Sequence, residues 1–73
     1  MSPELEHKLG KAILTRHHTS TVRDIICELA SELEFVPKQA WRTLEKWCDK
    51  GWYDYGVSID LGWLTDKGKE VFK

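Results

Sequence analysis

Basic side chains recur at intervals of four residues in the middle of this chain. They are Lys38, Arg42, Lys46 and Lys50. Residues four apart lie on one face of an α-helix, so these positions form a single basic row if the segment is helical. Such a row offers positive charge to the phosphates of a nucleic acid. The whole chain has a net charge of −1, so the basic character is local.

Polar side chains beside this row suit the edges of DNA bases. Arg and Lys pair with guanine, an amide such as Gln39 pairs with adenine, and Thr43 suits a phosphate or a methyl group. Two acids, Glu45 and Asp49, share the same face and are spaced to pair with the cations. The residues alone therefore leave two interpretations open, a nucleic-acid contact and an ordinary solvated helix face.

No pattern in the chain indicates catalysis or a metal site. Cys27 and Cys48 form no CxxC, and together with His7, His17 and His18 they give no usual zinc-ligand spacing. No Ser/His/Asp, Cys/His or phosphate-loop arrangement stands out. The sequence predicts neither an enzyme nor a bound cofactor. The pair His17-His18 is interpreted as a helix end, where a cationic side chain suits the helix dipole.

The length and composition predict one small domain over residues 1–73. Four Trp, two Tyr and two Phe supply much of the apolar surface that a small core needs. No run of about 18 apolar residues is present, and the charged N-terminus lacks a signal-peptide core. These features predict a cytoplasmic protein.

Three helices are predicted first, over residues 3–17, 22–33 and 37–50. Thr21 with Asp24 resembles a capping box that opens the second helix. Apolar residues at helical spacing indicate which face of each helix is buried. The predicted core positions are Leu9, Ile13, Leu14, Val22, Ile25, Ile26, Leu29, Leu33, Ala40, Leu44, Trp47 and Cys48.

After Gly51, where a left-handed residue is expected to end the third helix, the pattern becomes extended. Residues 52–55 and 59–63 are predicted strands of a short hairpin, and alternate residues of the second strand form an apolar face. Thr65 is expected to cap a last short helix that ends near Phe72. The predicted class is mainly helical α+β, with a three-helix core, a short hairpin and a C-terminal helix.

This order of elements, from residue 22 to residue 72, resembles the winged helix-turn-helix family of bacterial and phage regulators. The residues that carry the resemblance are Leu29, Ala30 and Leu33, then Ala40, Leu44, Trp47, Gly51 and Trp52, then Leu64, Thr65, Asp66, Lys67 and Gly68. The chain departs from the family pattern at Glu34, Val36 and Trp41. The family usually has a glycine, a capping Ser or Thr, and a small polar residue there.

The resemblance implies a regulator of transcription that binds double-stranded DNA, with the third helix in the major groove. It places base contacts on Gln39, Arg42 and Thr43. It places phosphate contacts on Lys38 and Lys46, and on Ser20, Thr21 and Arg23 at the start of the second helix. A single small module binds weakly, so a homodimer on a palindromic site is expected, joined through the first or last helix.

The hairpin supports a second interpretation. It carries Asp54 and Asp60, it is aromatic, and it contains no Lys or Arg. An acidic surface of this kind suits a protein partner better than it suits phosphate. The alternative function is therefore a winged helix that acts as a protein-interaction module through the hairpin and Trp41.

Overall fold

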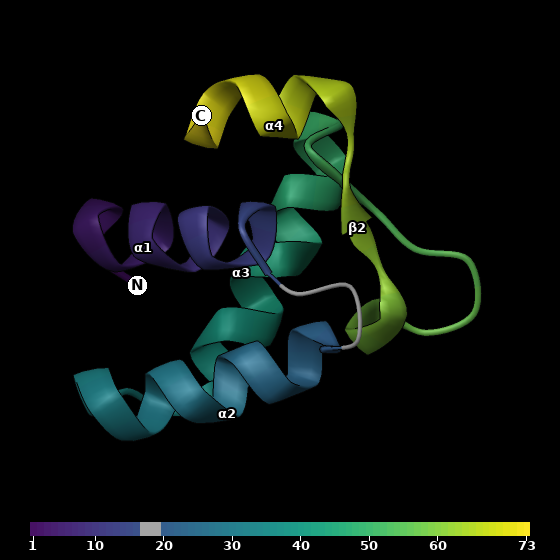
Figure 1. The fold of residues 1–73 in the computed structure, drawn as a ribbon. Helices are drawn as coiled ribbons and strands as arrows, with labels where there is room; N and C mark the ends of the chain where they lie inside the picture. Colours follow the sequence, from purple (N-terminus) through teal and green to yellow (C-terminus); the bar gives the residue numbers. More distant parts are fainter. Residues whose placement is uncertain (17–19) are drawn as a thin grey trace.

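Helices form most of the molecule, and a small sheet closes one end. The computed structural model describes residues 1–16 and 20–73, with the backbone alone at Asp60. The elements are α1 (Pro3–Leu14), α2 (Val22–Leu33), α3 (Pro37–Lys50), β1 (Tyr53–Asp54), the short 3-10 helix η1 (Ile59–Leu61), β2 (Trp63–Leu64) and α4 (Asp66–Phe72). Helix α3 crosses behind α1 and α2, α4 lies on the other side of α1, and the hairpin stands at one end (Figure 1). The predicted class, mainly helical α+β, is confirmed.

Local capping explains where α2 and α3 begin. The Thr21 hydroxyl accepts the Asp24 backbone N–H, and the Asp24 carboxylate accepts the Thr21 N–H, both at 3.2 Å. The predicted capping box is therefore confirmed. Val36 precedes α3 and makes no side-chain capping bond, because its side chain has no acceptor.

Helix α1 is shorter than predicted. It ends at Leu14, and not near His17 as the sequence predicted. The chain then turns toward the hairpin, where Arg16 Nη2 donates to the Gly62 carbonyl at 2.9 Å. This long-range contact has no signature in the local pattern of α1. The interpretation of His17-His18 as a helix end concerns residues outside the described part of the chain.

Trp47 of α3 lies at the centre of the core and is fully buried. Its Nε1 donates to a carboxylate oxygen of Glu6 in α1 at 2.6 Å, which satisfies the polar edge of the buried ring. Its ring lies 4.7 Å, centroid to centroid, from Phe72 of α4. The other buried apolar residues are Leu9, Ile13, Val22, Ile25, Ile26, Ala40, Leu44, Tyr53 and Leu64. The apolar faces predicted for the first three helices are confirmed, with Leu14, Leu29, Leu33 and Cys48 only partly buried.

Thr65 joins the hairpin to α4. Its hydroxyl accepts the Gly68 N–H at 3.1 Å and donates to the Gly51 carbonyl at 2.6 Å. Its own N–H donates to the Trp52 carbonyl at 2.9 Å. Gly68 lies so close to that carbonyl that a Cβ would overlap it. The Leu-Thr-x-x-Gly segment therefore fixes α4 to the end of α3, and the predicted cap at Thr65 is confirmed.

The hairpin is shorter than predicted, and the predicted apolar strand face over 59–63 is wrong. Only Trp63 and Leu64 pair with β1, in the register Tyr53↔Leu64 and Asp54↔Trp63. Residues 59–61 form η1, which the Tyr53 hydroxyl holds by donating to the Ile59 carbonyl. Ile59 packs against the core, whereas Leu61 and Trp63 are exposed. A turn of 3-10 helix breaks the two-residue period that a strand face requires.

Candidate nucleic-acid interface

The basic row lies on the solvent-facing side of α3. Lys38, Arg42, Lys46 and Lys50 are all exposed. Among the described residues, no carboxylate lies within 4.0 Å of any of these four cations. Lys50 is engaged differently, because its Nζ lies 4.4 Å from the centroid of the Trp52 ring. The first three cations therefore present unpaired charge, one helical turn apart.

Two acids share this surface. Glu45 and Asp49 are exposed on α3. Their spacing allows pairing with the neighbouring cations, yet neither forms an ion pair with a residue in the described ranges. The surface is consequently mixed in sign, and its positive charge is concentrated toward the first half of α3, before Glu45.

Four of the predicted DNA contacts line the same hollow, and three of them are exposed. Gln39, Arg42 and Lys46 line a shallow hollow of about 340 Å³ beside α3. Met1 and Thr43 complete its lining. The arrangement gives one amide and two cations along a single wall, which are groups that donate to phosphate oxygens and to acceptor atoms of bases. Sequence reasoning did not identify Met1, because nothing in the local pattern brings the N-terminus to α3.

The structure corrects the predicted place of Thr43. Its side chain is only 7% exposed. The hydroxyl donates to the Gln39 carbonyl one turn earlier at 2.9 Å, a bond that Ser and Thr readily make inside helices. The hydroxyl also lies 3.7 Å from the Met1 sulfur. Thr43 is therefore a packing residue between α3 and the N-terminus, on the buried side of the basic row.

Arg23 and Trp41 connect the start of α2 to α3. The guanidinium carbon of Arg23 lies 5.9 Å from the Trp41 ring centroid, which is a cation–π distance. Arg23 is exposed and Trp41 is partly buried against the core. The contact therefore places the Arg23 guanidinium beside α3.

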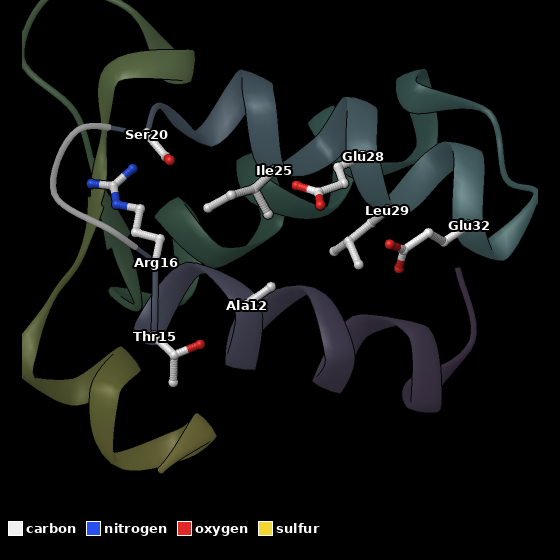
Figure 2. A pocket seen from close by; sticks show the side chains of 8 residues that line it. All are labelled: Ala12, Thr15, Arg16, Ser20, Ile25, Glu28, Leu29 and Glu32. Carbon is white, nitrogen blue, oxygen red and sulfur yellow. The ribbon is translucent and has the colours of Figure 1, made fainter.

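Ser20 and Thr21 have other contacts in the structure. Ser20 lines a groove of about 300 Å³ between α1 and α2, at the same end as Arg16 (Figure 2). Glu28 and Glu32 line the other part of this groove, which makes it acidic at that end (Figure 2). The oxygen of the Thr21 hydroxyl already caps α2. Of the three predicted contacts at the start of α2, Arg23 is the one with a described side-chain contact to α3.

The aromatic side chains of the hairpin divide into two groups. Tyr53 is buried in the core, and Trp52 packs partly against it. Tyr55 and Trp63 are exposed, by 43% and 47%, and Val57 near the tip is 92% exposed. The hairpin thus closes the core with one side and presents apolar groups to solvent with the other.

The two thiols lie in different surroundings. Within the described ranges, no group of three or more His, Cys, Asp or Glu is arranged to hold a metal ion. Cys27 is exposed on α2. Burial raises the pKa of the Cys48 thiol, and the carboxylates of Asp54, Asp49 and Glu45 raise that pKa further. Cys48 therefore stays protonated and unreactive near neutral pH.

Comparisons of the chain with known protein families, with curated proteins and with solved structures gave no match. No helix in the described part of the chain has the length and apolar character that crossing a membrane requires.

Proposed function

We propose that this protein is a winged helix-turn-helix module that binds double-stranded DNA and regulates transcription. The observation that carries the proposal is the row of exposed, unpaired cations on α3, formed by Lys38, Arg42 and Lys46. An α-helix fits the major groove of B-DNA, and cations along it replace the counterions of the phosphates.

The order of elements supports this proposal. Helix α2, a tight turn and α3 are followed by an antiparallel hairpin and a short helix. The turn contains Glu34 in the left-handed conformation, at the position where the family usually has glycine. Gly51 ends α3 in the same conformation, before the hairpin. Gly51 is one of the residues that carry the resemblance, and Glu34 adopts the left-handed conformation although it departs from the family's usual glycine.

Each exposed side chain has a proposed role. Arg42 is the proposed base reader, since a guanidinium donates two bonds to guanine, and Gln39 is its neighbour with an amide suited to adenine. Lys38 and Lys46 flank them and are proposed to contact phosphates. Arg23 extends these contacts from the start of α2. Thr43 is left out of the proposed interface because its hydroxyl is buried and bonded.

A fluorescence-anisotropy titration with labelled duplex DNA, selected from a random pool, tests the proposal. Arg42→Ala is expected to weaken binding to the selected site by about 1–3 kcal/mol and to relax the preference for one base pair. Lys67→Ala is the matched control, because Lys67 is an exposed cation on α4, away from the basic row. Equal losses in the two variants, or an unchanged sequence preference in Arg42→Ala, would remove Arg42 from this role.

A further inference from the structure

Trp63 is the centre of an exposed surface that the DNA proposal does not use. It is 47% exposed on β2 and lies opposite Asp54 of β1 in the strand register. Side chains of directly opposed residues lie on the same face of a two-stranded sheet. Trp63 and the exposed Asp54 therefore share the outer face of the hairpin, while their neighbours Tyr53 and Leu64 face the core.

A groove with cations lies on the other side of Trp63. It has a volume of about 460 Å³, and its apolar lining is Ile13, Leu14, Trp63 and Leu64. Its cations are Arg16 and Lys69. Arg16 is fixed there, because its guanidinium donates to the Gly62 carbonyl at the edge of the hairpin. Trp63 thus separates a carboxylate on one side from two cations on the other.

We propose that this surface binds a second copy of the same chain, in a two-fold dimer centred on Trp63. A two-fold axis beside the ring turns each molecule so that Asp54 of one copy faces the cationic groove of the other. The same contact then occurs twice, as the symmetry of such a dimer requires. The apolar walls of the groove and the Trp63 ring are the apolar surface that dimer formation would remove from water.

The charges favour a second copy over the other candidate occupants. The surface carries Asp54 on one side and Arg16 with Lys69 on the other, so two copies pair opposite charges at both contacts, whereas phosphates brought to this face would meet the repelling Asp54 carboxylate. A standard interface buries about 800 Å² per partner, roughly one sixth of the 4832 Å² exposed by this chain. Trp63 and the groove supply part of such an area.

Sedimentation velocity of the full chain, from about 10 µM to about 1 mM, tests the dimer. The wild-type chain is expected to dimerise within this range. Asp54→Lys leaves only cations at the contact. Lys69→Glu places an acid opposite Asp54, with Arg16 as the remaining cation of the groove, so each variant is expected to dimerise at least about tenfold more weakly. An equimolar mixture of the two variants pairs opposite charges at both contacts. The mixture is therefore expected to form a dimer that neither variant forms alone.

Two control variants complete the experiment. Lys67→Glu makes the same charge change on α4 outside the groove, and it is expected to dimerise like the wild type. Trp63→Ser is expected to abolish the dimer, with circular dichroism to confirm that the chain is folded. A wild-type chain that stays monomeric throughout the range overturns the proposal. So does a mixture that associates no better than its components, or an equal loss in Lys67→Glu. None of these measurements involves DNA, so the outcome is independent of the proposed function.

Discussion

Glu34 is the only residue other than glycine with a positive φ in the described part of the chain. Its φ is 53° and its ψ is 49°, at the end of α2. A side chain with a Cβ crowds the neighbouring carbonyl oxygen in this conformation, and glycine does not. The turn between α2 and α3 is thus formed against a local backbone preference.

Glu34→Gly is expected to raise the free energy of unfolding by about 1 kcal/mol, because it removes this strain. Urea unfolding followed by circular dichroism measures the change. Glu34→Ala removes the same carboxylate but keeps the Cβ, and it is expected to give no such gain. If both variants had a higher free energy of unfolding than the wild type, the charge of Glu34, and not its backbone conformation, would be the cause.

Cys48 gives a second residue-scale prediction, because its pKa is raised in the folded protein. In a Cys27→Ser variant, alkylation of Cys48 by iodoacetamide is expected to have its midpoint at a higher pH than in the urea-unfolded chain. Asp54→Asn should lower this midpoint, whereas Asp66→Asn, an exposed carboxylate on α4, should leave it in place. A midpoint equal to that of the unfolded chain would contradict the raised pKa.

The raised pKa of Cys48 also predicts how the stability of the fold depends on pH. The folded thiol holds its proton to higher pH than the unfolded thiol does. Its contribution to stability is therefore fully present below the unfolded pKa and is lost as pH rises through the folded pKa. Cys48 is therefore expected to lower the free energy of unfolding only at alkaline pH.

At the scale of elements, Phe72 provides a close contact between α4 and α1. Phe72 of α4 packs over Gly10 of α1, and a Cβ on Gly10 would overlap the Phe72 ring. The ring also lies between Trp47 and Trp52, with centroids at 4.7 Å and 5.9 Å. Phe72 therefore has little room to move away from a larger residue.

Gly10→Ala is expected to lower the free energy of unfolding by about 1–3 kcal/mol, through overpacking against Phe72. Helix propensity alone predicts the opposite sign, a gain of about 0.5–1 kcal/mol for alanine inside a helix. Lys11→Ala, at the exposed neighbouring position, is the control for propensity. Urea unfolding of both variants distinguishes the two effects, and a stabilised Gly10→Ala would show that α4 is not tightly packed there.

The elements could be predicted from the sequence where the signals are local. Capping at Thr21 and Thr65, the left-handed Gly51 and the apolar periodicity of the helices are such signals, and each is confirmed. The end of α1 and the course of residues 59–61 involve side-chain contacts that hydrophobic periodicity does not reveal, one of them with a distant residue. Arg16 reaches the hairpin, and the Tyr53 hydroxyl holds the turn at Ile59. Periodicity within a short window carries no information about either contact.

The same distinction applies to the candidate site. The spacing of Lys38, Arg42 and Lys46 correctly predicted a row of exposed cations. The burial of Thr43 was not predicted, because it depends on Met1 covering that side of α3. The groove beside Trp63 was not predicted either, since its residues come from α1, β2 and α4.

At the scale of the whole molecule, the charged surfaces are separated by element. The cations proposed for DNA lie on α3 and at the start of α2, and the hairpin contributes none. The proposed dimer surface lies on the hairpin, the end of α1 and α4. Binding of DNA and association of two copies therefore do not compete for the same residues.

The salt dependence of duplex binding tests the central proposal most directly. Phosphate contacts by Arg23, Lys38 and Lys46 are expected to give a plot of log affinity against log salt with a slope of about −2.7 for each chain, at about −0.9 for each neutralised phosphate. Lys38→Ala and Lys46→Ala should each make the slope shallower by about one unit, whereas Lys67→Ala should not. No binding of duplex DNA at low salt, or a slope that these variants leave unchanged, would contradict the proposal that α3 binds DNA.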